Sequence, residues 1–236
     1  MNYYYANIEQ DTDVIHPRNK FNHYSTLYTW HTRYSIGGKE DKNHQEPITN
    51  LCVWAFNQFN ELTISKEIKK YTSHEQTMYF NDEELNQEQF NFFVNFVQEW
   101  LDANFALLPI YMYDHFGITI STGPFDCPFD NGQIGIIYIK KSTCERIGIS
   151  LDDAREILKR DIEEINNYLT GNVFSISIYE TDEEEYDGDI IYEDEITPKN
   201  RKLIECVGGY YGYNSTFSQS EILLATYQKE RETETV

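Results

Sequence analysis

Three short segments carry side chains that could perform acid–base or nucleophilic chemistry. Asp114 and His115 are adjacent at the end of an apolar run, and a nearby carboxylate can tune an imidazole for proton transfer. Cys127 lies in a loop restrained by two prolines and two glycines. His31 and Arg33 share one face if their segment is a strand. Converged in space, these side chains could form a hydrolase-like active site or a zinc site.

Each of these segments also has a structural interpretation. Neighbouring side chains of an extended chain point to opposite faces, so we do not expect Asp114 to orient His115 directly. The acidic neighbours of Cys127 do not favour a thiolate nucleophile. The chain has no Walker loop, GxGxxG, HExxH or GxSxG motif. The sequence therefore favours a binding protein over an enzyme, and it predicts no cofactor and no metal site.

Acidic residues are concentrated near the C-terminal end. Thirteen acids and no Lys or Arg occur from Asp161 to Pro198. The segment 179–196 is predicted to form an acidic hairpin with its turn at Asp187-Gly188. It holds the ten candidate partner-binding residues, namely Glu180, Asp182, Glu183, Glu184, Glu185, Asp187, Asp189, Glu193, Asp194 and Glu195.

This predicted hairpin has three interpretations. Alternate carboxylates on one strand face lie about 7 Å apart, near the phosphate spacing of a nucleic-acid strand, so they could occupy a basic nucleic-acid-binding groove. The same charges could instead keep a solvated edge from pairing with other strands. A divalent-cation site is the third interpretation, although the spacing does not match an EF-hand loop.

The overall composition supports a folded, acidic protein. The 236 residues include 15% aromatic side chains and carry a formal net charge of -21. Such a charge repels nucleic-acid phosphates and anionic membranes, and it attracts basic protein surfaces. We expect no direct nucleic-acid or membrane binding. Four widely spaced cysteines, no leader segment and no long apolar run predict a cytoplasmic location.

The order of predicted elements indicates an α+β fold. Residues 27–36 are expected to form a strand, and residues 107–141 a β-rich centre. Amphipathic helices are predicted at 81–105, capped by Asn81, and at 149–171, with Ser150 and Asp153 as a capping box. Further strands and a short helix from near residue 218 follow. We expect a single α+β domain, 1–236, with two long amphipathic helices packed on an antiparallel sheet.

Four motifs give the chain a family resemblance. They are WHTRYSIGG (30–38), YDHFGITISTGPFDCPFDNGQIGIIYI (113–139), YLTGNV (168–173) and CVGGYYGY (206–213). In this order they resemble an uncharacterised family of phage and mobile-element proteins for which no activity is established. The chain departs from the family pattern at Phe116, Gly123, Asp126, Phe129 and Asn131, and its acidic segment is enlarged. The resemblance implies a phage setting and no particular mechanism.

Two functions follow as expectations. The first is a phage-encoded counter-defence or host-takeover inhibitor, of the anti-CRISPR kind. It would bind a host defence or nucleic-acid-binding protein through the ten carboxylates, as a nucleic-acid mimic in the cytoplasm of an infected bacterium. The alternative is a small hydrolase-like enzyme that uses His31, Arg33, Asp114, His115 and Cys127. The aromatic segment near residues 210–214 also allows a homodimer.

Overall fold

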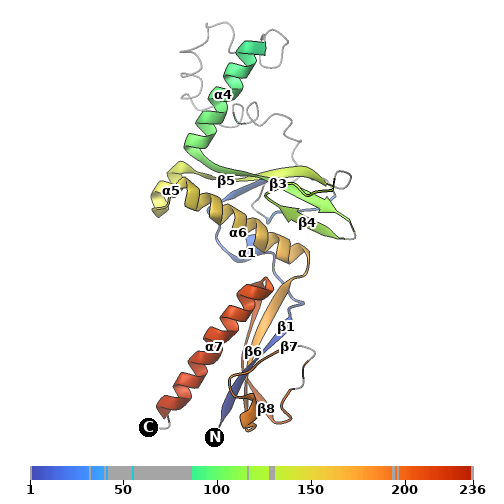
Figure 1. Ribbon diagram of the computed structural model, residues 1–236, viewed down its shortest axis with the longest axis vertical. Coiled ribbons are helices and arrows are strands. Elements are labelled where there is room, and N and C mark those ends of the chain that lie inside the picture. Colours follow the sequence, from blue (N-terminus) through green and yellow to red (C-terminus); the bar gives the residue numbers. More distant parts are fainter. Residues whose placement is uncertain are drawn as a thin grey trace. The chain divides into compact units, whose positions relative to one another are not determined.

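The structure is a computed structural model that describes residues 2–31, 33–39, 41, 55, 87–115, 117–127, 131–192, 195 and 197–234. Its helices and antiparallel-rich strands confirm the predicted α+β class (Figure 1). The strands form two four-stranded sheets where one was expected. The chain also divides into two compact units, and the single domain that the sequence predicts stays a prediction.

The first unit comprises residues 1–21, 114–119 and 163–236. Its sheet has the order β7-β1-β6-β8. The elements of this unit are β1 (Tyr3–Gln10), α1 (Pro17–Lys20), β6 (Val173–Thr181), η1 (Glu184–Tyr186), β7 (Ile190–Tyr192), β8 (Arg201–Tyr211) and α7 (Tyr213–Glu234). Strand β1 is antiparallel to β6 and parallel to β7. The first strand of the chain is therefore a central strand of a sheet that the last third of the chain completes.

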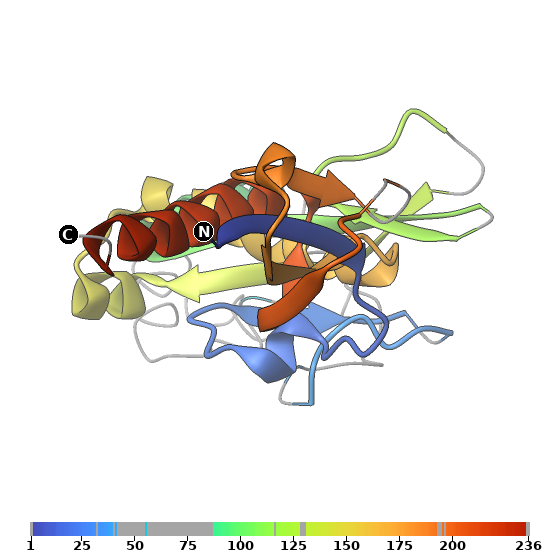
Figure 2. The same cartoon turned by 90° about the horizontal axis from the view of Figure 1, so that it is seen from below.

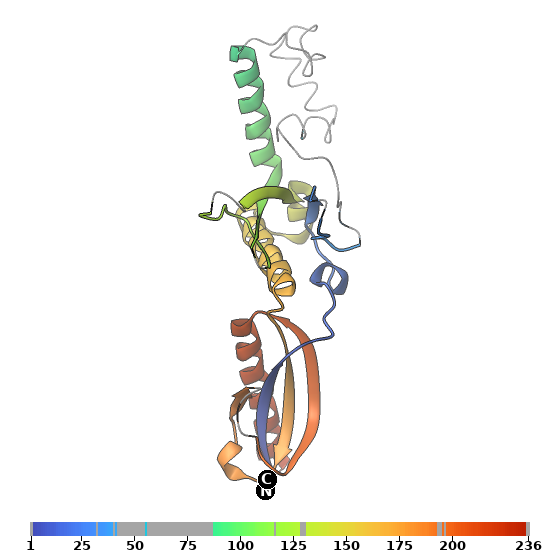
Figure 3. The same cartoon turned by 90° about the vertical axis from the view of Figure 1, so that its right-hand side faces the viewer.

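Helix α7 packs on one face of this sheet (Figure 3). Because side chains alternate along a strand, Ala6, Ile176 and Ile178 face the same side, and Leu224 of α7 is buried against them. The helix begins at Tyr213 and is longer than the short helix predicted from near residue 218. The aromatic residues around Gly212 are typical of a strand, and for this reason the sequence did not predict that the helix begins at Tyr213.

Replacing Ile178 with Ala should destabilise this unit strongly. The Ile178 side chain is fully buried, so its truncation should lower the free energy of unfolding by about 2–5 kcal/mol. Ile222 of α7 is 59% exposed, and its replacement with Ala should change stability by less than about 0.5 kcal/mol. Urea denaturation of the two variants measures both values. Equal losses would contradict this packing.

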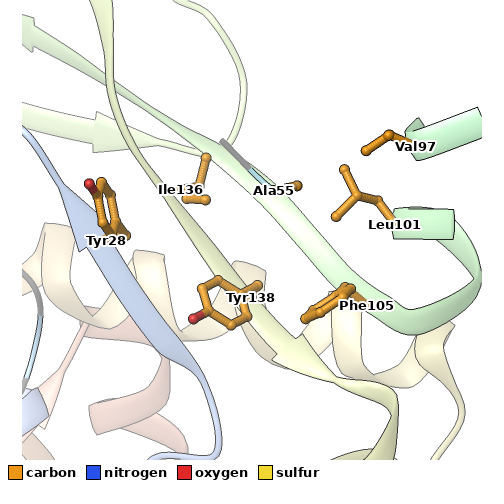
Figure 4. Packing of buried hydrophobic residues seen from close by; sticks show 7 residues of the cluster. All are labelled: Tyr28, Ala55, Val97, Leu101, Phe105, Ile136 and Tyr138. Atoms are coloured by element: carbon orange, nitrogen blue, oxygen red, sulfur yellow. The ribbon is translucent and has the colours of Figure 1, made fainter. Parts of the chain in front are cut away.

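The second unit comprises residues 22–113 and 120–162, with the sheet order β2-β5-β3-β4. Its elements are β2 (Thr26–Thr29), α4 (Gln87–Asn104), β3 (Phe105–Asp114), β4 (Ile118–Ser121), β5 (Asn131–Lys140), α5 (Lys141–Ile147) and the first part of α6 (Leu151–Leu169). Figure 4 shows its main hydrophobic cluster, formed by Tyr28, Ala55, Val97, Leu101, Phe105, Ile136 and Tyr138. The side chains of α4 thus pack with those of β2, β3 and β5.

Helix α6 confirms the second predicted amphipathic helix. Ser150 Oγ accepts a hydrogen bond from the Asp153 backbone N–H at 3.0 Å, and Asp153 Oδ2 accepts one from the Ser150 N–H at 3.2 Å. This is the predicted capping box. The Ser150 hydroxyl also donates to Asp153 Oδ2 at 2.7 Å, and this hydrogen bond, followed by the one from the Ser150 N–H, lowers the pKa of the Asp153 carboxyl. Gly171 follows the helix with φ +71°. Helix α4 matches the other prediction over Gln87–Asn104, whereas the predicted cap Asn81 lies outside the described residues.

Candidate functional site

The acidic segment connects β6 to β7, and the predicted hairpin is wrong. Strand β1 lies between β6 and β7, and β7 runs parallel to β1. The Gly188 N–H donates to the Tyr4 carbonyl at 2.8 Å, and the Ala6 N–H donates to the Asp189 carbonyl at 2.9 Å. We call residues 182–189 the acidic loop; it includes η1 and lies along β1 (Figure 2). The β7 pairing partner therefore comes from the far end of the chain, which turn signals do not reveal.

Three of the ten candidate carboxylates make structural contacts, and two of them, Asp187 and Glu183, hold this loop in place. Asp187 Oδ1 is 2.9 Å from Arg231 Nη1 and accepts a hydrogen bond from the Tyr4 N–H at 3.3 Å. Glu183 Oε1 accepts hydrogen bonds from the Lys199 N–H at 2.9 Å and from the Asn200 N–H at 3.4 Å. Glu180 lies 3.5 Å from Lys202 Nζ and also accepts a hydrogen bond from the Asn2 amide. These acids are half-buried and structural, so they are poor candidates for partner contacts.

A second group of carboxylates is exposed to solvent. It consists of Asp182, Glu184, Glu185, Asp189 and Glu195. Asp182 is 3.4 Å from the Asn200 amide, and Glu195 Oε2 accepts a hydrogen bond from the Tyr192 N–H at 3.0 Å. No ion pair in the described part of the chain involves Glu184, Glu185 or Asp189. Glu193 and Asp194 lie outside the described residues.

Tyr186 is the aromatic residue of the acidic loop and ends η1. The centroid of its ring lies 6.1 Å from the centroid of the Tyr5 ring on β1. Desolvation, followed by the negative charges of Glu185, Glu183 and Asp189, raises the pKa of the Tyr186 hydroxyl. The carboxylates therefore act together on one aromatic residue, which is itself packed against the sheet. Among the described residues, no group of three or more His, Cys, Asp or Glu side chains is placed to hold a metal ion.

The residues of the enzyme alternative have structural contacts of their own. His31 Nδ1 accepts a hydrogen bond from the Tyr34 N–H at 3.1 Å, and the two rings stack with centroids 5.2 Å apart. The Arg33 guanidinium lies 5.8 Å from the centroid of the same Tyr34 ring. Strand β2 ends at Thr29, so the predicted strand 27–36 is too long and its alternation does not apply to His31 and Arg33. His31 stabilises a turn in this structure.

The other three residues lie at or beyond the ends of strands. Asp114 ends β3, and the His115 N–H donates to the Gly117 carbonyl at 3.2 Å. Cys127 is a half-buried free thiol in the loop before β5. Asp114 and His115 belong to the first unit, whereas His31, Arg33 and Cys127 belong to the second. Convergence of the five side chains on one catalytic site stays a prediction.

Two of the sequence motifs meet within the second unit. The Trp30 backbone N–H donates to the Ile134 carbonyl at 2.9 Å, and Trp30 Nε1 donates to the Gln133 carbonyl at 3.1 Å. A Cβ atom at Gly135 would lie 2.6 Å from the Tyr28 carbonyl oxygen. The first motif thus docks onto the GQIG part of the central motif, where only a glycine lets the two strands approach.

The other two motifs meet within the first unit. The Gly212 N–H donates to the Asn172 carbonyl at 2.9 Å, which joins the segments 206–213 and 168–173. Asp11 Oδ2 accepts a hydrogen bond from the Gly209 N–H at 2.8 Å, and Lys20 Nζ donates to the Gly208 and Gly209 carbonyls, each at 3.2 Å. These glycines let side chains from the start of the chain reach the β8 backbone.

Sequence reasoning missed a polar cluster around Asp161. The Asp161 carboxylate accepts a hydrogen bond from Ser25 Oγ and lies 3.5 Å from His23 Nδ1. The side chains of His23 and Asp161 are only 11% and 12% exposed. Asp161 therefore joins α6 to the segment before β2 and does not belong to the acidic surface, although it begins the acidic stretch of the sequence.

Comparisons with protein-family models, with curated proteins and with solved structures each find no match to this chain. The motif resemblance to phage proteins accordingly stays a prediction. Among the helices of the described residues, none is both long enough and apolar enough to cross a membrane.

Proposed function

We propose that this protein acts by binding a basic surface of another protein through the exposed carboxylates of the acidic loop and its neighbourhood. The observation that supports this proposal is that some acids anchor the loop while others are exposed to solvent. Asp187 and Glu183 fasten the loop, whereas Glu184, Glu185 and Asp189 are exposed and have no cationic partner among the described residues. The binding groups are Glu184, Glu185 and Asp189, together with the exposed carboxylates of Asp182 and Glu195.

Anchoring matters because a held charge binds better than a mobile one. A carboxylate on a fixed backbone loses less conformational freedom when it pairs with a partner's Lys or Arg. The net charge of -21 adds a long-range field that speeds the approach of a basic partner. The ion pairs and the long-range field both weaken as salt is added, because the Debye length falls to about 8 Å at physiological ionic strength.

The motif resemblance suggests where such a partner would be found. In a phage setting, the basic surface belongs to a host defence protein or another host protein that binds DNA or RNA. The exposed carboxylates then take the place of nucleic-acid phosphates at the same Lys and Arg side chains. On this proposal the protein is an inhibitor, and it acts in the cytoplasm of the infected bacterium.

The proposal is tested by capture followed by competition. Tagged protein is incubated with host lysate at low and at high salt, and each captured protein is purified. We expect a captured nucleic-acid-binding protein to release a fluorescent oligonucleotide when this protein is added, as measured by anisotropy. Displacement should weaken as salt rises. A captured protein that retains its oligonucleotide at saturating inhibitor would contradict the proposal.

A further inference from the structure

A stacked pair of tyrosines joins the end of β7 to the start of α7. Tyr192 and Tyr213 stack with ring centroids 5.6 Å apart and an interplanar angle of 24°. Phe174 of β6 meets the Tyr213 ring edge-on, with centroids 5.9 Å apart. The Tyr213 side chain is nevertheless 43% exposed. This is a large aromatic surface that two neighbouring rings hold in place.

The backbone before Tyr213 explains how the ring is positioned. Gly212 has φ +90°, and a Cβ atom there would lie 2.9 Å from the Asn167 amide nitrogen. The Gly212 N–H is bonded to the Asn172 carbonyl, as described above, so the turn into α7 is fixed on both sides. Because the turn is fixed, little conformational entropy remains to be lost when a ligand contacts the ring.

Two carboxylates accompany the aromatic pair. Glu195 is fastened by the hydrogen bond from the Tyr192 N–H, and Glu221 lies about two helical turns after Tyr213 on α7. Both are exposed, and neither takes part in an ion pair within the described ranges. Desolvation raises the pKa of Tyr192, and so do its hydrogen bond to Tyr213 and the charges of Tyr213, Glu195 and Glu221. The negative charges therefore act on the aromatic pair itself.

We propose that Tyr192, Tyr213, Glu195 and Glu221 form a binding site for an arginine side chain of the partner. A planar guanidinium stacks on an aromatic face and pairs with carboxylates at its edge, which a compact ammonium group does less well. The stacked rings and the Glu195 carboxylate, which is fastened to the Tyr192 backbone, offer both kinds of contact, and Glu221 adds a second negative charge from α7. This inference rests on the proposed function and specifies which side chain of the basic partner is recognised.

The test uses synthetic peptides in which three arginines alternate with glycines, with lysine and citrulline versions as comparisons. Isothermal titration at about 150 mM salt, where exposed charges are screened as in the cell, measures the dissociation constants. The arginine peptide should bind most tightly, and the uncharged citrulline peptide should not bind. Tyr213→Ala should weaken arginine binding about fivefold, whereas Tyr213→Phe, which keeps the ring, should retain it.

A second variant covers the case in which Tyr213→Ala does not fold. Glu195→Gln with Glu221→Gln removes both charges, and the new amide oxygen at position 195 can still accept the hydrogen bond from the Tyr192 N–H. This double variant should also weaken arginine binding several-fold. Equal binding of the arginine peptide to wild type and to the double variant would overturn the arginine site.

Neutralising Glu184, Glu185 and Asp189 distinguishes this site from the proposed function. If only that neutralisation weakens partner binding, the acidic loop binds the partner and the arginine site is wrong. If only the Tyr213 and Glu195/Glu221 variants lose binding, the arginine site is correct and the acidic loop is not the contact. Failure of the arginine peptide to bind wild type at all also overturns the site.

Discussion

The triple variant Glu184→Gln, Glu185→Gln, Asp189→Asn is expected to bind the partner about tenfold more weakly than wild type. Each exposed ion pair contributes about 0.2–1 kcal/mol, so three lost pairs together account for a loss of this size. The variant should also show a shallower dependence of affinity on salt, because fewer ionic contacts remain to be screened. Surface plasmon resonance with the captured partner, at a series of salt concentrations, measures both effects.

The matched control removes the same charge from elsewhere on the surface. Glu99, Glu145 and Glu163 are exposed and lie on α4, α5 and α6. Their replacement with Gln changes the net charge equally and leaves the acidic loop intact. We expect this control to lower the association rate slightly and to keep the dissociation rate unchanged. Equal weakening by both triple variants would mean that only net charge matters, and the localised surface would be wrong.

The choice of these three positions depends on the structural partners of the other acids. Neutralising Asp187 would remove the ion pair to Arg231 and a hydrogen bond to β1. Neutralising Glu183 would weaken its hydrogen bonds to the backbone of residues 199 and 200. A loss of partner binding in either variant would then reflect a displaced loop as much as a lost contact.

Gly135→Ala should destabilise the second unit more than the same methyl addition elsewhere on β5. The new Cβ atom would lie 2.6 Å from the Tyr28 carbonyl oxygen and 3.0 Å from Thr29 Cγ2. The first of these atoms belongs to the backbone of β2, so strand pairing itself must shift. Overpacking of this kind costs about 1–3 kcal/mol. Thermal unfolding should show a lowered midpoint.

Gly132 provides the control on the same strand. A Cβ atom at Gly132 has no neighbour within 4 Å, so Gly132→Ala should leave the midpoint almost unchanged. Comparing the two variants separates the destabilisation caused by the steric conflict at Gly135 from the general effect of replacing a glycine in a strand. Equal midpoints for the two variants would show that β2 and β5 are not as close as described. The docking of Trp30 onto β5 would then be in doubt as well.

Local patterns predicted local structure well. The Ser150 and Asp153 capping box depends on residues three positions apart, and α6 begins there as expected. The α+β class likewise follows from periodicities within single segments. The pairing of β7 with β1 could not be predicted in this way, because its partners are separated by most of the chain. A turn signal such as Asp187-Gly188 indicates a bend without specifying which strand lies beside it.

The negative charge of the candidate surface could be predicted from the sequence, but which of its acids are exposed and which are anchored could not. The sequence shows ten acids between residues 180 and 195 and no cation among them. The cations that engage some of these acids are Lys202 and Arg231, both outside that stretch. Only the fold brings them together, so only the fold separates anchoring carboxylates from exposed ones. The aromatic partners of Tyr213 could not be predicted for the same reason, since Phe174 and Tyr192 come from two other elements.

The central position of β1 has a consequence for folding on the ribosome. Tyr4 and Asp187, which contact one another through the β1 backbone, are 183 residues apart in the chain. Both edges of β1 therefore stay unpaired until β6 and β7 have been synthesised, by which time most of the chain has emerged. Folding dominated by such distant contacts is slow. During synthesis, β1 with its run of three tyrosines is open to chaperones and to pairing with other nascent chains.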